Sequence, residues 1–162
     1  MKKHLSIQIS SGYTIIEIII SVFILVMLFA SIQAGYRQYI LVKSLDSAKG
    51  MIVSDIKLAK EYALAGKKPP GCMGLSGYIY STDSTNNRYF IIADCITDVE
   101  IKKVDIANLA RGIIIGSDIS VLFKIMGMGT NVPEGSYRSF NLSQQTTGNI
   151  RTVTITSAGE VK

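Results

Sequence analysis

The sequence predicts an α+β fold in which one long amino-terminal helix packs on a carboxy-terminal antiparallel β-sheet domain. Three observations lead to this prediction: an apolar run of membrane length near the amino terminus, a helical period that continues beyond it, and a change to a period of two after residue 71. A chain of 162 residues has room for one domain of ordinary size beside such a helix.

The first element is the apolar run, which accounts for most of the high mean hydropathy of +0.31. Within residues 15–32 the polar residues are Glu17, Ser21 and Ser31. A helix over residues 13–33 rises about 30 Å, the thickness of the hydrocarbon core of a bilayer. The run therefore predicts a helix that crosses a membrane once.

Basic residues predict the orientation of this helix. Lys2, Lys3 and His4 precede the run, and the next basic residue is Arg37. By the positive-inside tendency, the short amino-terminal flank stays in the cytoplasm and the rest of the chain lies outside it. The formal net charge of +5 falls to +3 without Lys2 and Lys3, which is too small to indicate nucleic-acid binding.

The second element, residues 34–65, is predicted to be an amphipathic continuation of the same helix. It ends at Gly66, which Pro69 and Pro70 follow. Its polar residues occupy the opposite side from an apolar stripe that includes three alanines, which allow close packing. The stripe consists of Leu41, Leu45, Ala48, Ile52, Ile56, Ala59 and Ala63.

The third element, residues 66–162, is predicted to be an exported β-rich domain. Short runs of alternating apolar residues, separated by polar turns, indicate strands, and the stripe on the helix is the surface available to cover one antiparallel sheet. A glycine-rich loop is expected at residues 127–135. The predicted strands are residues 77–81, 88–94, 98–104, 112–115, 119–126, 137–142 and 150–156.

The two cysteines, Cys72 and Cys95, both lie in the part predicted to be outside the cytoplasm. An even number of cysteines in an oxidising compartment favours a disulfide. The alternative is two buried free thiols, which behave as small apolar side chains.

Residues 12–17 read GYTIIE and lead into the apolar run. This pattern resembles the prepilin signature of type IV pilins and type II secretion pseudopilins. The resemblance implies a pilin-like ladle fold and a leader, residues 1–12, that a prepilin peptidase removes by cutting between Gly12 and Tyr13. The same enzyme would then methylate the new amino terminus of Tyr13.

The resemblance also implies a role for Glu17. In the family, the equivalent glutamate pairs with the terminal amine of a neighbouring subunit when the apolar helices bundle into a filament. The implied partners are the peptidase and methyltransferase, other pilin or pseudopilin subunits, an inner-membrane assembly platform, and membrane lipid before assembly. An alternative reading is that Glu17 lies close enough to the membrane edge to reach water. Both readings can hold, the second before assembly and the first after it.

Residues 89–94, residues 121–123 before the glycine-rich loop, and residues 150–162 resemble, more weakly, the minor pseudopilins of the GspH and FimT type. Some FimT-like proteins bind DNA through arginines in a terminal Gly-Arg-x-Arg tail, whereas residues 159–162 here read GEVK. Because Glu160 would repel phosphate, nucleic acid is not an expected partner, and a DNA-binding minor pilin for natural transformation remains an alternative. The chain also lacks the late helix proline found in many major pilins.

No catalytic chemistry, cofactor or metal site is expected. The only histidine, His4, falls in the expected leader, so the rest of the chain lacks a histidine general base. Residues 83–87 resemble a calcium loop but lack its glycine and its distant acidic residue, which favours a solvated hairpin turn. Four lysines are interpreted as a solvated helix face and its cationic end, with anionic lipid or nucleic acid as the alternative ligand; they are Lys57, Lys60, Lys67 and Lys68.

Two hypotheses from other classes remain. The chain could be a single-pass anchored binding module that never polymerises, which predicts an uncut chain and a dispensable Glu17. It could also be a secreted protein cut by signal peptidase near Ala34, but Ile32 makes the small-residue pattern before that cut poor.

Overall fold

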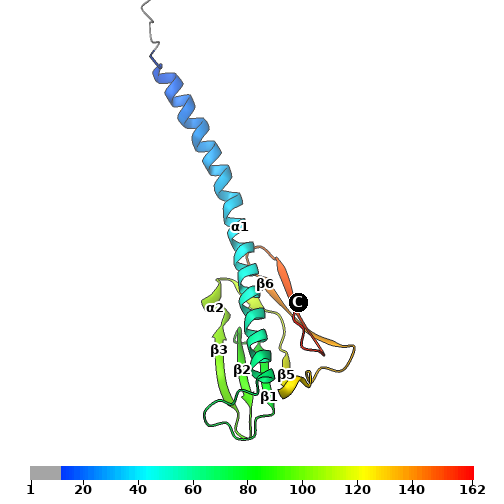
Figure 1. Ribbon diagram of the computed structural model, residues 1–162. Helices are drawn as coiled ribbons and strands as arrows, with labels where there is room; N and C mark the ends of the chain where they lie inside the picture. Colours follow the sequence, from blue (N-terminus) through cyan, green and yellow to red (C-terminus); the bar gives the residue numbers. More distant parts are fainter. Residues whose placement is uncertain (1–11) are drawn as a thin grey trace, which may run out of the picture. The chain divides into compact units, whose positions relative to one another are not determined.

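The computed structural model describes residues 12–162 and shows the α+β class that the sequence predicts. One long helix is followed by antiparallel strands (Figure 1). The chain divides into two compact units, Met1–Gln38 and Tyr39–Lys162, and the helix contributes to both. The expected leader, residues 1–12, lies outside the described residues except for Gly12, and so do Lys2, Lys3 and His4.

Helix α1 runs from Ile15 to Leu64, within two residues of the predicted limits at each end. Its carboxyl end is closed by two backbone bonds: Gly66 N–H donates to the Ala63 carbonyl at 3.1 Å, and Lys67 N–H donates to the Tyr62 carbonyl at 3.0 Å. This is the Schellman arrangement, which requires a left-handed residue after the helix. Gly66 supplies it with φ of 56°.

The predicted apolar stripe on the second half of α1 forms one side of the domain core. Six of its seven residues are buried, and Leu41 at its start is partly exposed. They pack with tyrosines from the strands, among them Tyr78, Tyr80 and Tyr89, which are at most 1 % exposed. Three of the six are alanines, whose small side chains leave room for these large rings in the same core. The buried members are Leu45, Ala48, Ile52, Ile56, Ala59 and Ala63.

The strands form two sheets, so the expectation of a single sheet is wrong. The four-stranded sheet has the order β3 (Val99–Asp105), β2 (Arg88–Asp94), β1 (Gly77–Asp83), β5 (Ser120–Lys124). The three-stranded sheet has the order β4 (Ile113–Ile115), β6 (Tyr137–Gln144), β7 (Ile150–Thr156). Every pairing is antiparallel. The chain changes sheet before β4, after β4 and again after β5, because β4 pairs with β6 rather than with its neighbours in sequence. Both sheets contribute to one core with α1.

All seven predicted strands are present, with small shifts of their limits. They are β1 (Gly77–Asp83), β2 (Arg88–Asp94), β3 (Val99–Asp105), β4 (Ile113–Ile115), β5 (Ser120–Lys124), β6 (Tyr137–Gln144) and β7 (Ile150–Thr156).

Two short helical elements were not predicted. Helix α2 spans Ile106–Leu109, where Ile106 is buried. The 3-10 turn η1, Ile125–Gly127, replaces the end of the strand predicted at residues 119–126. Met126 within it has φ of 55°, a left-handed conformation that ends the extended backbone and that side-chain alternation does not reveal.

Three of the four sheet edges are covered by other parts of the chain. The Asn87 side chain donates to the Ile113 carbonyl at 2.7 Å and accepts from Ile115 N–H at 2.9 Å, so it occupies the edge of β4 as a strand residue would. Residues 129–131 bond to β5, and residues 161–162 bond to β7. The fourth edge is β3. Its pairing with β2 is interrupted by a β-bulge, and it carries Lys102 and Lys103. Both features disfavour pairing with another strand.

Candidate assembly and processing site

The candidate cleavage position lies in exposed backbone outside the helix. Gly12, Tyr13 and Thr14 precede α1 and are not helical. The Tyr13 side chain is 80 % exposed, and a Cβ added to Gly12 would meet nothing within 4 Å. The structure thus leaves both residues that flank the expected cut open to an enzyme.

Thr14 forms the amino-terminal cap of α1. Its carbonyl accepts hydrogen bonds from the N–H groups of Glu17 and Ile18 at 3.1 and 3.2 Å, and its hydroxyl accepts from Glu17 N–H at 3.3 Å. A side-chain oxygen at this position satisfies one of the first N–H groups, which have no partner within the helix. The helix therefore starts immediately after Thr14.

The sequence contains a signal for this cap, but Thr14 and Glu17 were interpreted only as part of the prepilin pattern. Thr14 and Glu17 form the T-x-x-E pattern of a capping box ahead of an apolar run. In the structure only the threonine half of the box is formed, because no described residue forms a hydrogen bond or an ion pair with the Glu17 carboxylate.

The two serines of the apolar run, unlike Glu17, form side-chain hydrogen bonds within the helix. The Ser21 hydroxyl donates to the Glu17 carbonyl at 2.7 Å, and the Ser31 hydroxyl donates to the Met27 carbonyl at 3.1 Å. Such bonds within the helix satisfy a hydroxyl in a medium without water. Within residues 15–32, Glu17 is thus the polar side chain without a partner among the described residues.

The apolar run is uncovered on all sides. Its large side chains are between 52 and 80 % exposed, from Ile15 at 80 % to Ile24 and Leu25 at 52 %. By length and composition, α1 is the one helix among residues 12–162 that is long and apolar enough to cross a membrane. A helix that is apolar all round requires lipid or other apolar helices around it.

Cys72 and Cys95 are joined by a disulfide, as the cysteine count favours. Both residues are buried, with 3 and 9 % of their surface exposed. The bridge connects the segment between α1 and β1 to the segment that follows β2. The Ile96 N–H also donates to the Met73 carbonyl at 2.8 Å, which fixes the same two segments together.

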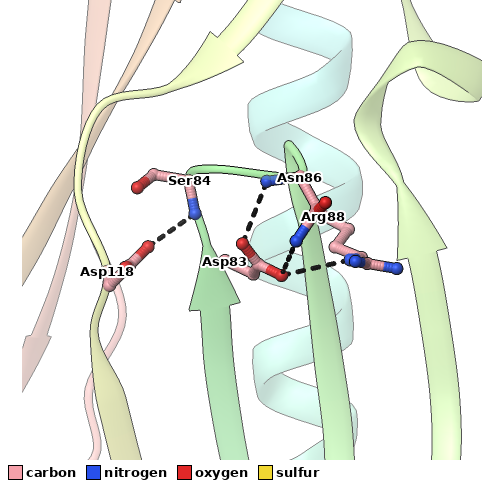
Figure 2. Close-up of polar contacts among 5 residues, drawn as sticks. All are labelled: Asp83, Ser84, Asn86, Arg88 and Asp118. Carbon is pink, nitrogen blue, oxygen red and sulfur yellow. Dashed lines mark hydrogen bonds and ion pairs between the residues drawn. The ribbon is translucent and has the colours of Figure 1, made fainter.

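The loop considered as a calcium site is a hairpin turn whose carboxylate is already engaged. Asp83 accepts hydrogen bonds from the Asn86 backbone and side chain at 2.9 and 2.7 Å, and from Arg88 at 3.1 Å (Figure 2). The bonds from Asn86, with Arg88 beside them, lower the pKa of Asp83 below its usual value. Asp118 accepts instead from Ser84 N–H at 2.5 Å, so the carboxylates hold the turn in place. No group of metal-binding side chains occurs among residues 12–162.

A buried polar network connects α1 to the four-stranded sheet. Asp55, which is 9 % exposed, accepts from the Tyr89 hydroxyl at 2.6 Å and pairs with Lys102 at 2.7 Å. Burial and the bond to Asp55 raise the pKa of Tyr89, and burial raises that of Tyr80 well above its usual value. Because both Asp55 oxygens have protein partners, this network fixes the helix on the sheet. The sequence pattern did not single out Asp55, although it lies between Ile52 and Ile56 of the stripe.

The four lysines considered as a ligand site do not form one basic patch. Lys60 donates to the Gly159 carbonyl at 3.0 Å, and Lys67 lies 4.2 Å from the centre of the Tyr62 ring. The lining of a groove of about 510 Å³ contains Lys57, Lys60 and Lys162 and also the acidic Glu61 and Glu160, which offset part of the positive charge. The groove gives a polyanion no uniform positive surface.

Comparison with known proteins adds no family to this description. No protein-family model matches the chain, and no curated protein or solved structure matches it either.

Proposed function

We propose that this chain is a structural subunit of the minor pilin or pseudopilin kind. It is made as a precursor, anchored in the cytoplasmic membrane by residues 13–33, with its amino terminus in the cytoplasm and residues 66–162 outside. A prepilin peptidase cuts it after Gly12 and methylates Tyr13. The trimmed chain then enters a type II secretion pseudopilus or a type IV pilus.

One observation carries this proposal: the uncovered apolar run, residues 15–32, contains a single carboxylate, Glu17, which has no partner among the described residues. Glu17 is the third residue of α1, about 3 Å along its axis from Ile15. Near the membrane edge its charge costs less than the roughly 2.5–3.5 kcal/mol expected at the centre of a bilayer. The monomer is therefore tolerated in lipid.

Near the membrane edge the Glu17 carboxylate can reach water, and assembly into a filament removes it from water. A carboxylate buried among apolar helices is strongly unfavourable unless it is paired, and losing one partner of a buried pair costs about 3–5 kcal/mol. The amine that cleavage creates at Tyr13 is a cation four residues from Glu17 in sequence. A neighbouring subunit that brings its Tyr13 amine to Glu17 neutralises both charges and fixes the register between the helices.

The domain supports the same assignment. Its core is filled by α1 and both sheets, and its sheet edges are covered or protected, as described above. Contacts through strand addition are therefore disfavoured. The apolar run is the large surface that still requires partners, which are lipid and the assembly platform first and sibling subunits afterwards.

The first test concerns processing. The full chain is co-expressed with the prepilin peptidase of the same organism, and its size is compared with that of Gly12→Ala. We expect the wild type to lose residues 1–12 and the variant to keep them, because a side chain at this position obstructs the cut. Equal processing of both chains, or none of either, contradicts the proposal and favours an anchored module that is not assembled.

The second test concerns assembly. We expect Glu17→Ala to be cut normally but to be lost from sheared filaments or from cross-linked subunit complexes. Ser21→Ala is the matched control, because Ser21 lies one turn further along the helix and its hydroxyl is already satisfied by the Glu17 carbonyl. Normal incorporation of Glu17→Ala would mean that another residue sets the register.

A further inference from the structure

The start of α1 determines whether the candidate scissile carbonyl is free. Hydrolysis after Gly12 adds water to the Gly12 carbonyl and releases Tyr13 as an amine. Among the described residues, no backbone N–H donates to the Gly12 carbonyl, and the first carbonyl that the helix engages is that of Thr14. The boundary that Thr14 sets thus leaves the reacting carbonyl available.

The sequence offers another place for the helix to start. Ser10 and Ser11 precede Gly12, and serine is as good an amino-terminal cap as threonine. A helix capped by Ser11 would place Gly12 and Tyr13 in its first turn. The Gly12 carbonyl would then accept a bond from Ile16 N–H, four residues later, and could no longer be attacked without breaking that bond.

We propose that Thr14 is a positioning residue for processing, a role that rests on the proposed function. Its hydroxyl and carbonyl hold the helix start at Ile15 and so keep the Gly12–Tyr13 peptide out of the helix. Thr14 acts through the conformation of its neighbours and need not contact the peptidase. The cap at Thr14 thus keeps the Gly12–Tyr13 bond in the non-helical form that a peptidase can cut.

The test compares variants of the full-length precursor in detergent or membranes with the purified peptidase. Thr14→Val keeps the shape of the side chain but removes the capping oxygen. Thr14→Ser and Thr14→Asn keep a capping oxygen with different shapes. A fourth variant adds Ser10→Ala and Ser11→Ala to Thr14→Val and removes the competing caps.

We expect Thr14→Val to be cut more slowly, by at most about fivefold, because loss of a typical cap shifts the equilibrium between the two helix starts by about that factor. Thr14→Ser and Thr14→Asn should be cut at nearly the wild-type rate, and removal of the two serines should restore cleavage of Thr14→Val. Backbone carbon chemical shifts of Gly12 and Tyr13 in micelles should move toward helical values in Thr14→Val and return to the wild-type values in the restored variant.

Cleavage of Thr14→Val at the wild-type rate or faster would overturn the inference, since it would show that the cap does not control access. Equal slowing of Thr14→Ser and Thr14→Val would also overturn it. Serine keeps the capping oxygen, so the loss of rate would then come from the change of side chain and not from the loss of the cap. Both results leave the proposed function intact if the wild type is cut. An uncut wild type refutes the proposed function itself, and Thr14 positioning with it.

Discussion

The disulfide provides a quantitative test of the domain. Replacing both cysteines, Cys72→Ser with Cys95→Ser, opens a loop whose ends are 23 residues apart in sequence. In the chain-entropy model a loop of this length contributes about 3.4 kcal/mol at 25 °C. For a domain the size of Tyr39–Lys162, this corresponds to a fall of about 13 °C in Tm.

The assay is unfolding of the full chain in detergent, followed by near-ultraviolet circular dichroism of tyrosine. The chain has 8 tyrosines and no tryptophan, and the buried Tyr78, Tyr80 and Tyr89 report on packing in the core. Reducing agent should lower the Tm of the wild type to that of the double variant and leave the double variant unchanged. If the two chains unfold at the same temperature without reducing agent, the bridge does not constrain the domain as described.

Two further predictions concern buried and exposed polar contacts. Tyr89→Phe should lose about 1–3 kcal/mol of stability in urea unfolding, because it removes the bond to Asp55, whereas Tyr80→Phe should lose none, because the buried Tyr80 hydroxyl has no partner among residues 12–162. Equal losses would contradict the network. The lowered pKa of Asp83 predicts stability that is present above about pH 4 and is lost as the pH falls through the pKa of the folded state, so Asp83→Asn should weaken this acid dependence. An identical pH profile for Asp83→Asn would refute the turn contacts.

Sequence periodicity was sufficient to predict the elements of this fold but not their arrangement. The 3.6-residue period located α1 and its buried stripe from Leu45 to Ala63, and short β-rich runs between polar turns located all seven strands. Alternation shows that a strand has a buried face but does not show which strand it pairs with. The separation of β4, β6 and β7 into a second sheet therefore emerged only from the structure.

In the candidate site, too, the sequence predicts local features but not contacts between distant residues. Glu17 was evident because one carboxylate in an apolar run stands out in any sequence. The cap at Thr14 is local, and its T-x-x-E pattern was available in the sequence. Asp55 was not predictable in this way, since its partners Tyr89 and Lys102 come from distant strands that only the folded domain brings to the helix.

The central claim is that trimming after Gly12 creates the cation that satisfies Glu17. The intact mass of the natural chain, purified from the cell envelope, tests it most directly. The account predicts a chain that begins with N-methylated Tyr13 and lacks residues 1–12. A chain that retains these residues, or that is cut elsewhere, has no amine at Tyr13 and would contradict the account.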